Sequence, residues 1–205
     1  SAYSEQGQAG NTKSWESAEY LKDWGLTSMN ASTAYALGFN GSGVKIGVMD
    51  SGVLLNHPEF QDGRIHVVKT EGTYSKDSMR YPDASVGNGP INKNEPVKNG
   101  KRNFDKTDNG IFTKGEAFNI DGAWHKYTND AHGTHVGGTM AASRDGNEMH
   151  GVAFGANLYS ANTGGNDNMT YGPNQDYSFF LQGYSALADA GAKVINNSWG
   201  SNRRV

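Results

Sequence analysis

Residues 44–52, with the sequence VKIGVMDSG, form an almost unbroken apolar run of strand length that ends at Asp50 and Gly52. A strand with one solvated face alternates apolar and polar residues, whereas a continuous apolar run is typical of a strand buried on both faces of a parallel sheet. Helices must then cover both faces of that sheet. The run therefore favours an α/β fold.

Other segments fit the same architecture. Strands are predicted over 65–68, 156–161 and 193–198, and helices over 30–37 and 178–191. We expect Asn30 to cap the first of these helices and Gly38 to end it. The alternation of strands and helices predicts right-handed crossovers and a parallel sheet coated by helices.

Residues 70–130 interrupt this pattern. The segment is rich in Asn, Asp, Lys, Gly and Tyr, and it holds Pro82, Pro90 and Pro96. A loop of this length without structure is unusual inside a compact domain. We therefore expect a loop-rich surface insertion with a small hairpin of its own.

The composition argues against several functional classes. The formal net charge is -3 and there is no basic block, so no bulk charge attracts the chain to nucleic acid or to an anionic membrane. The absence of cysteine excludes disulfides, thiolate metal sites and cysteine nucleophiles, so a nucleophile would have to carry oxygen. No apolar run approaches the roughly 18–20 residues of a transmembrane helix. Because residue 1 is Ser rather than Met, we expect a processed or trimmed chain.

Two residues are candidates for catalysis. Asp50 ends the apolar strand, and ligands of open α/β sheets bind outside the carboxyl ends of the strands; the simpler interpretation is that it only begins a turn. His132 opens a segment of small residues that lets a helix pack closely against a sheet. The simpler interpretation there is a structural histidine, which is also what we expect of His57, His66, His125 and His150.

The pair His132 and His135 has the spacing of two metal ligands on one helical face. A hydrolytic zinc site also needs a third protein ligand and usually a nearby carboxylate base, but Gly133 and Thr134 stand between the two histidines. We therefore predict no metal ligation by this pair. His135 is expected to pack or to form a hydrogen bond within the helix.

Three blocks of sequence, taken in order, resemble the subtilisin-like serine proteases. These are VKIGVMDSG with the following HPEF, HGTHVGGTMAA with the following GVAFGANLYS, and AKVINNSWGS. The opening WGLTSMNASTAYALGFNGSG is also similar to the start of the protease domain in bacterial autotransporter subtilases. The resemblance implies a subtilisin-like parallel sheet flanked by helices, with Asp50 as the orienting carboxylate and His132 as the general base.

The same resemblance assigns a substrate wall. It implies that Ser198, Trp199 and Gly200 line the cleft near the scissile residue, where a peptide would pair as an added strand. For Trp199 the alternative is core packing. Residues 162–167, NTGGND, could form the opposite edge of the cleft or an ordinary turn.

The family carries its nucleophile in a Gly-Thr-Ser-x-Ala type segment and its oxyanion-hole asparagine in another, and neither segment occurs in these residues. Ser198 lacks the glycine-flanked turn that exposes a nucleophile. We therefore expect residues 1–205 to be the N-terminal part of one catalytic domain. Alone it should be inactive, and the C-terminal portion of the same protease should be its partner.

The predicted function is a serine endopeptidase, secreted or at a bacterial cell surface, that acts on extended polypeptides. The alternative is an inactive relative that binds peptides in the same cleft. No cofactor is predicted, although relatives often carry a calcium loop after the histidine helix. Glu59 and residues 143–148, SRDGNE, offer hard oxygen ligands of the kind calcium accepts, as well as ordinary turn residues.

Overall fold

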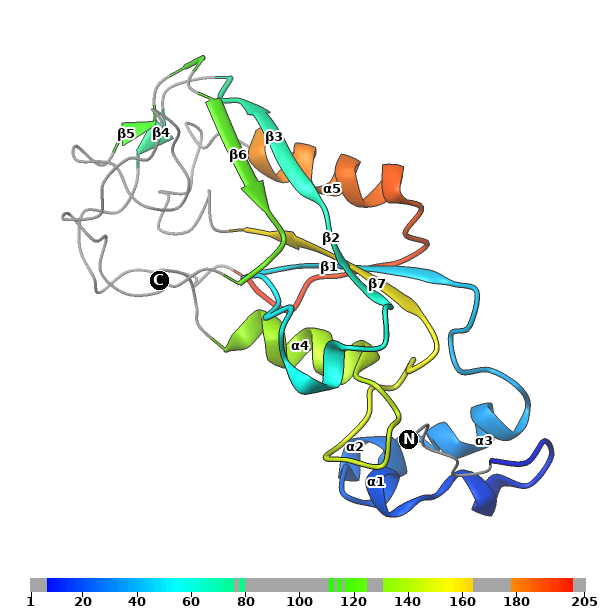
Figure 1. The fold of residues 1–205 in the computed structure, drawn as a ribbon. Helices are drawn as coiled ribbons and strands as arrows, with labels where there is room; N and C mark the ends of the chain where they lie inside the picture. Colours follow the sequence, from blue (N-terminus) through cyan, green and yellow to red (C-terminus); the bar gives the residue numbers. More distant parts are fainter. Residues whose placement is uncertain are drawn as a thin grey trace, which may run out of the picture.

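The computed structural model describes residues 7–75, 78–79, 111–112, 114–115, 117–124, 131–163 and 178–200. Its helices and strands, in chain order, are η1 (Thr12–Trp15), α1 (Ala18–Leu21), α2 (Trp24–Ser28), α3 (Ala31–Ala36), β1 (Lys45–Asp50), η2 (Pro58–Phe60), β2 (Ile65–Val67), β3 (Lys69–Thr73), β4 (Ser78–Met79), β5 (Ile111–Phe112), β6 (Ala117–Asp121), α4 (His132–Ala141), β7 (Asn157–Asn162), α5 (Ser178–Ala190) and β8 (Ile195–Asn196). Figure 1 shows their arrangement.

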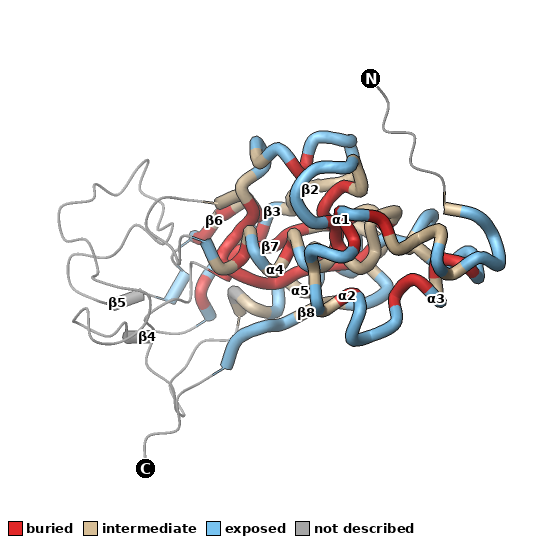
Figure 2. The backbone as a smooth tube through the Cα atoms, turned by 90° about the horizontal axis from the view of Figure 1, so that it is seen from below, coloured by how far each residue is buried: buried red, intermediate tan, exposed pale blue. Residues whose placement is uncertain are grey.

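A four-stranded parallel sheet in the order β2-β7-β1-β8 forms the centre of the molecule. From Ile46 to Asp50, every residue of β1 is buried. Figure 1 shows α4 on one side of the sheet and α5 on the other, and Figure 2 shows the buried residues concentrated along the central strands. The α/β fold predicted from the apolar run is confirmed.

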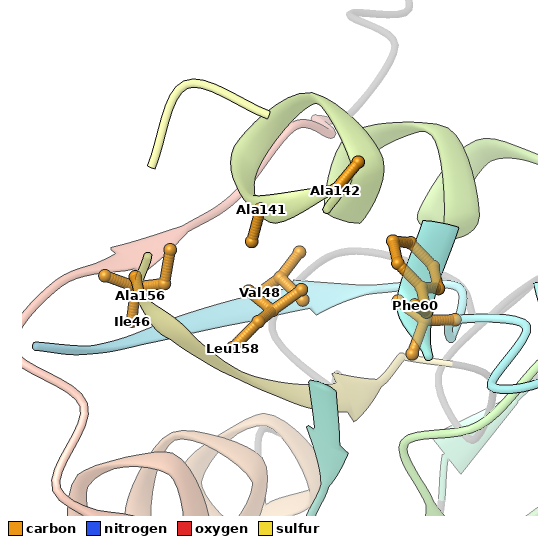
Figure 3. Close-up of a cluster of buried hydrophobic side chains, with 8 residues drawn as sticks. Ile46, Val48, Phe60, Ala141, Ala142, Ala156 and Leu158 are labelled. Carbon is orange, nitrogen blue, oxygen red and sulfur yellow. The ribbon is translucent and has the colours of Figure 1, made fainter. Parts of the chain in front are cut away.

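Alternation along β1 divides the core into two layers. Ile46 and Val48 pack beneath α4 with Leu158 and Ala141, as Figure 3 shows. Met49 points to the other face and packs with Leu187 of α5. Asp50 shares the parity of Ile46 and Val48, so its side chain belongs to the α4 face. This parity places a carboxylate on the side of the sheet where the histidine helix lies.

β3 and β6 form a two-stranded antiparallel ribbon, with Lys69 opposite Asp121 and Thr73 opposite Ala117. In the sequence, these two strands lie on either side of most of the predicted insertion. β4 and β5 form a second short antiparallel pair. The ribbon packs against α5 through Thr70, and a Cβ on Gly183 would contact the Thr70 hydroxyl. These pairs are the kind of hairpin structure expected for residues 70–130, most of which lie outside the described residues.

The N-terminal segment folds into a 3-10 helix, η1, and three short α-helices, of which only α3 was predicted from the sequence. Ser17 and Asp23 cap α1 and α2 by accepting backbone N–H groups. Asn30 precedes α3 as predicted, but its backbone is left-handed with φ 56 and its side chain makes no capping hydrogen bond. The expected cap is therefore wrong in mechanism. Gly38 follows the helix with φ 93, which agrees with its predicted role as a stop.

Two strand boundaries differ from prediction. β7 begins and ends one residue later than expected, and β8 pairs with β1 only at Ile195 and Asn196. Within the described residues, no helix is long and apolar enough to cross a membrane.

Candidate functional site

Asp50 and His132 meet at the carboxyl end of β1. Nδ1 of His132 lies 2.7 Å from Oδ1 of Asp50, although 82 residues separate them in the sequence. The carboxylate is 3% exposed and the imidazole is 41% exposed. A buried carboxylate beside a partly exposed imidazole can fix the Nδ1–H tautomer, so that Nε2 keeps its lone pair and can accept a proton.

Backbone contacts hold the start of α4 against the turn that follows Asp50. The N–H of Gly133 donates to Oγ of Ser51 at 2.9 Å, and the N–H of Leu54 donates to Oγ1 of Thr134 at 3.0 Å. A Cβ on Gly133 would collide with the carbonyl oxygen of Gly52. Glycine at position 133 therefore allows the helix to approach closely enough for His132 to reach Asp50.

Asp50 is held by its own neighbours as well. Its Oδ1 accepts the N–H of Ser51 at 2.7 Å, and its backbone carbonyl accepts the N–H of Thr163 at 2.7 Å. Among the described residues, Oδ2 is buried without a hydrogen-bond partner. The carboxylate thus presents one oxygen to both the backbone and the imidazole.

The remaining histidines behave differently from His132. His57 accepts the N–H of Glu59, His66 stacks on Tyr159, and His150 is buried among aromatic rings with Nδ1 2.8 Å from the carbonyl oxygen of Gly151. Burial lowers the pKa of His150. These contacts agree with structural roles, while His125 lies outside the described residues.

His135 does not pack as expected, because its side chain is exposed on α4. Its backbone carbonyl accepts a hydrogen bond from the Thr139 hydroxyl at 2.9 Å. Within the part of the chain that the structure describes, no cluster of three potential ligands includes His132 or His135.

The segment that leaves β8 returns to the end of β1. Nε1 of Trp199 donates to the carbonyl oxygen of Met49 at 2.6 Å, and its ring stacks on Phe180 of α5 with centroids 5.3 Å apart. Trp199 nevertheless remains 45% exposed. Ser198 accepts a hydrogen bond from Asn196 at 2.8 Å, and Gly200 is exposed. All three predicted wall residues are therefore exposed, and Trp199 is anchored one residue from Asp50.

Only the first two residues of the segment 162–167 are described. Asn162 and Thr163 are buried, and the amide of Asn162 donates to the carbonyl oxygens of Ser51 and Ala123. The side chain of Asn162 therefore does not line an open edge. Residues 164–167 lie outside the described residues.

A second cluster of acidic groups lies beyond the far end of α4. Carboxylate oxygens of Glu19, Glu59 and Asp145 all lie within 4.8 Å of one another. Glu59 is 5% exposed, and its Oε2 has no hydrogen-bond partner among the described residues. Burial and the neighbouring carboxylates of Asp145 and Glu19 raise the pKa of Glu59 to about 7.

This acidic cluster fits a hard cation. Three carboxylates in a partly buried position repel one another, and calcium accepts carboxylate oxygens at variable coordination number. Glu19 also accepts the N–H of Gly146 at 2.8 Å, which ties α1 to the loop after α4. Glu59 and residues 143–148 could be predicted from the sequence as possible ligands, whereas Glu19 could not, because nothing in a short N-terminal helix indicates where its side chains will dock.

Comparison with known proteins agrees with this geometry. The profile of the subtilase family matches residues 41–205. The chain is 34% identical over 203 residues to an extracellular serine protease of Serratia marcescens, an alignment that covers 97% of this chain and 14% of that protein. It is 31% identical over 189 residues to Bacillopeptidase F of Bacillus subtilis (strain 168), covering 87% of this chain and 10% of that protein.

Subtilisin BL of Lederbergia lenta is 26% identical over 178 residues, covering 87% of this chain and 45% of that protein. The chain thus spans less than half the length of each of these relatives. The matched region contains the Asp50 strand, the His132 helix and the strand that leads to Trp199. The chain belongs to the subtilase family of serine proteases.

Proposed function

We propose that this chain supplies two of the three catalytic groups of a serine endopeptidase. Asp50 orients the imidazole of His132, and His132 acts as general base toward a serine hydroxyl in a segment that follows Val205. The single observation that carries this proposal is the 2.7 Å contact between a buried carboxylate oxygen and Nδ1 of a partly exposed imidazole.

The proposed chemistry follows from which nitrogen of the His132 imidazole is hydrogen-bonded to Asp50. A serine hydroxyl is a weak nucleophile at neutral pH and needs an adjacent base to take its proton. With Nδ1–H donating to Asp50, Nε2 of His132 takes that proton as the serine oxygen bonds to the peptide carbonyl carbon, and then delivers it to the departing amine. The Asp50 carboxylate stabilises the imidazolium that exists between these two transfers.

The proposed substrate is an extended polypeptide. Residues 197–200 leave the β8 edge beside Asp50, and Trp199 is fixed there by Met49 and Phe180 while almost half of its side chain stays exposed. A substrate main chain could pair beside this segment as an added strand, with Ser198, Trp199 and Gly200 against the residue that precedes the cleaved bond.

The C-terminal portion of the protease is the proposed partner of this chain. β8 is the edge of the four-stranded sheet, and Leu181 and Val194 on α5 and its connection to β8 are 63% and 60% exposed. An exposed strand edge beside apolar side chains is a surface that a further part of the domain would cover.

We also propose that Glu19, Glu59 and Asp145 bind calcium. The ion would supply the positive charge that these three carboxylates lack, and its contribution is to stability, because the cluster lies at the opposite end of α4 from His132. Secretion is proposed as well, because two relatives from Serratia marcescens are named extracellular proteases. The autotransporter arrangement remains a proposal drawn from the resemblance of residues 24–43.

Labelling with a fluorophosphonate probe tests the central proposal. The full-length protein should be labelled and should cleave a denatured protein, whereas Asp50→Asn and His132→Ala variants should show little of either. This chain expressed alone should be unlabelled. If the full-length protein captures peptide but resists the probe, the chain belongs to an inactive peptide-binding relative. Activity abolished by a chelator but untouched by the serine reagent would instead favour a metallopeptidase.

A further inference from the structure

The turn after Asp50 is tied to the end of β7 by a buried amide. Asn162 is the last residue of β7, pairs in register with Asp50, and is 0% exposed. Its Nδ2 donates to the carbonyl oxygen of Ser51 at 3.1 Å and to that of Ala123 at 3.0 Å. A primary amide nitrogen carries two hydrogens, so one side chain can satisfy two backbone carbonyls that converge from different elements.

Ser51 is the residue through which this contact reaches both candidate catalytic groups. Its N–H donates to Oδ1 of Asp50, and its Oγ accepts the N–H of Gly133, the residue that follows His132. Its carbonyl oxygen is the one that Asn162 holds. Ser51 is 4% exposed, so these hydrogen bonds are shielded from water.

The peptide units on both sides of Ser51 are therefore fixed to β7. The Asp50 carbonyl accepts the N–H of Thr163 at 2.7 Å, and the Ser51 carbonyl accepts the amide of Asn162. Directly afterwards the chain turns at Gly52, with φ 94, where a Cβ would contact Nδ2 of Asn162 at 2.7 Å. With both carbonyls held, the backbone that carries the Ser51 hydroxyl is fixed beside the first turn of α4.

We propose that Asn162 is a positioning residue that, through Ser51, sets the separation of the Asp50 carboxylate and the His132 imidazole. It touches neither the substrate nor the reacting atoms. This inference rests on the proposed function, because it assigns a role within the Asp50 and His132 pair. Without the amide, the Ser51 carbonyl would lose the hydrogen bond from Asn162, the turn would reorient, and the hydroxyl that anchors Gly133 would move with it.

The test uses full-length protein and two independent readouts. One is the low-field proton resonance of the hydrogen on His132 Nδ1, which reports the hydrogen bond to Asp50 whether or not the protein cleaves anything. The other is kcat and KM for a peptide substrate. The variants are Asn162→Asp, which replaces the amide nitrogen that donates both hydrogen bonds with an oxygen of nearly the same size, and Ser51→Ala, which removes only the hydroxyl.

For both variants we expect loss of the His132 resonance and a fall in kcat on the order of 10- to 100-fold, because small displacements of catalytic groups have effects of that size. KM should change much less. Ser51→Thr, which keeps the hydroxyl, should retain the resonance and most of kcat. The matched control is Asn157→Asp at the opposite end of β7, where the amide oxygen meets His66 at 3.2 Å, and it should leave both readouts unchanged.

The two proposals can fail separately. If the wild-type protein cleaves no peptide but shows a His132 resonance that is lost in Asp50→Asn, Ser51→Ala and Asn162→Asp, the protease function fails while the positioning role stands. If Ser51→Ala and Asn162→Asp remain folded and keep both the resonance and kcat, the positioning role is overturned. Should Asn162→Asp not fold, Asn162→Ala takes its place, because it removes both hydrogen bonds without placing a charge in the core, and Ser51→Ala still tests the link to Gly133.

Discussion

The acidic cluster gives a prediction whose size follows from the structure. Glu59 is almost fully buried beside Asp145 and Glu19, and its pKa is raised from 4.5 to about 7, chiefly by burial and then by these carboxylates. In the absence of a cation, the folded protein binds a proton at Glu59 that the unfolded chain has already released. The folded state therefore binds more protons across this window, and the free energy of unfolding falls as the pH rises from about 4.5 to about 7.

A neutral side chain of the same shape removes this effect. Each pKa unit corresponds to about 1.4 kcal/mol, so Glu59 costs up to about 3 kcal/mol of stability at pH values above both pKa values. Without metal, the Glu59→Gln variant should be more stable than wild type by up to this amount at about pH 8, which would raise Tm by roughly 6–12 °C for a domain of about 150–250 residues and by less for a larger unit. Near pH 4.5 the two proteins should be nearly equal.

Added calcium should reverse the order, because Glu59 is a ligand in the proposed calcium site and the variant lacks that ligand. Denaturant and thermal unfolding of full-length protein, inactivated by His132→Ala to prevent self-digestion, provide the measurement in metal-free buffer and in calcium. Asp189→Asn on the exposed surface of α5 is the control for the loss of one charge. Parallel pH profiles for wild type and Glu59→Gln, or equal responses to calcium, would refute the reasoning.

Three further predictions concern the proposed active site. Asp50→Asn should leave the fold intact and lower kcat on the order of 10⁴-fold, measured by steady-state peptide cleavage, since the amide favours the wrong imidazole tautomer; a loss below tenfold would contradict the assigned role. Gly133→Ala places a Cβ against the Gly52 carbonyl, so it should destabilise the protein by about 1–3 kcal/mol in denaturant unfolding and abolish activity. An unchanged Tm would show that α4 can shift at no cost. Trp199→Phe keeps a ring but loses the indole donor to the Met49 carbonyl, and should raise KM several-fold with little change in kcat; an unaffected KM would place the wall elsewhere.

The predictable parts of the site are those that local sequence determines. Asp50 could be placed because it ends a buried strand and so lies at the carboxyl end of the parallel sheet. The small residues after His132 indicated a helix in close contact with that sheet. Parity along β1 then puts Asp50 on the α4 face. None of these inferences needed a knowledge of distant contacts.

The parts that were missed depend on groups brought together by folding. In the sequence, Ser51 is an ordinary turn residue and Asn162 an ordinary residue at the end of a strand. Their roles depend on folding, which brings the carbonyl of Ala123, just after β6, to the amide of Asn162. Likewise, the sequence does not indicate that Glu19 belongs to the acidic cluster, because this contact forms only when α1 docks on the loop that contains Gly146. β8 ends earlier than predicted, and beyond its last pair the Met49 carbonyl accepts the indole N–H of Trp199 in place of a backbone N–H.

The two ends of α4 are fixed by different means, and this separates stability from catalysis. At its start, Gly133 and Thr134 are hydrogen-bonded to the turn after Asp50. After its end, the N–H and hydroxyl of Ser143 both donate to the backbone carbonyl of Glu59, at 2.9 and 2.8 Å, and neither contact needs the Glu59 carboxylate. Loss of a cation would therefore loosen the contact of Glu19 and α1 with the loop after α4 before it disturbed α4 itself. Chelation should accordingly lower Tm and expose the N-terminal segment to proteases, while kcat of the protein that remains folded stays close to its value with calcium. A parallel loss of kcat would mean that the acidic cluster and the Asp50 and His132 pair are structurally coupled.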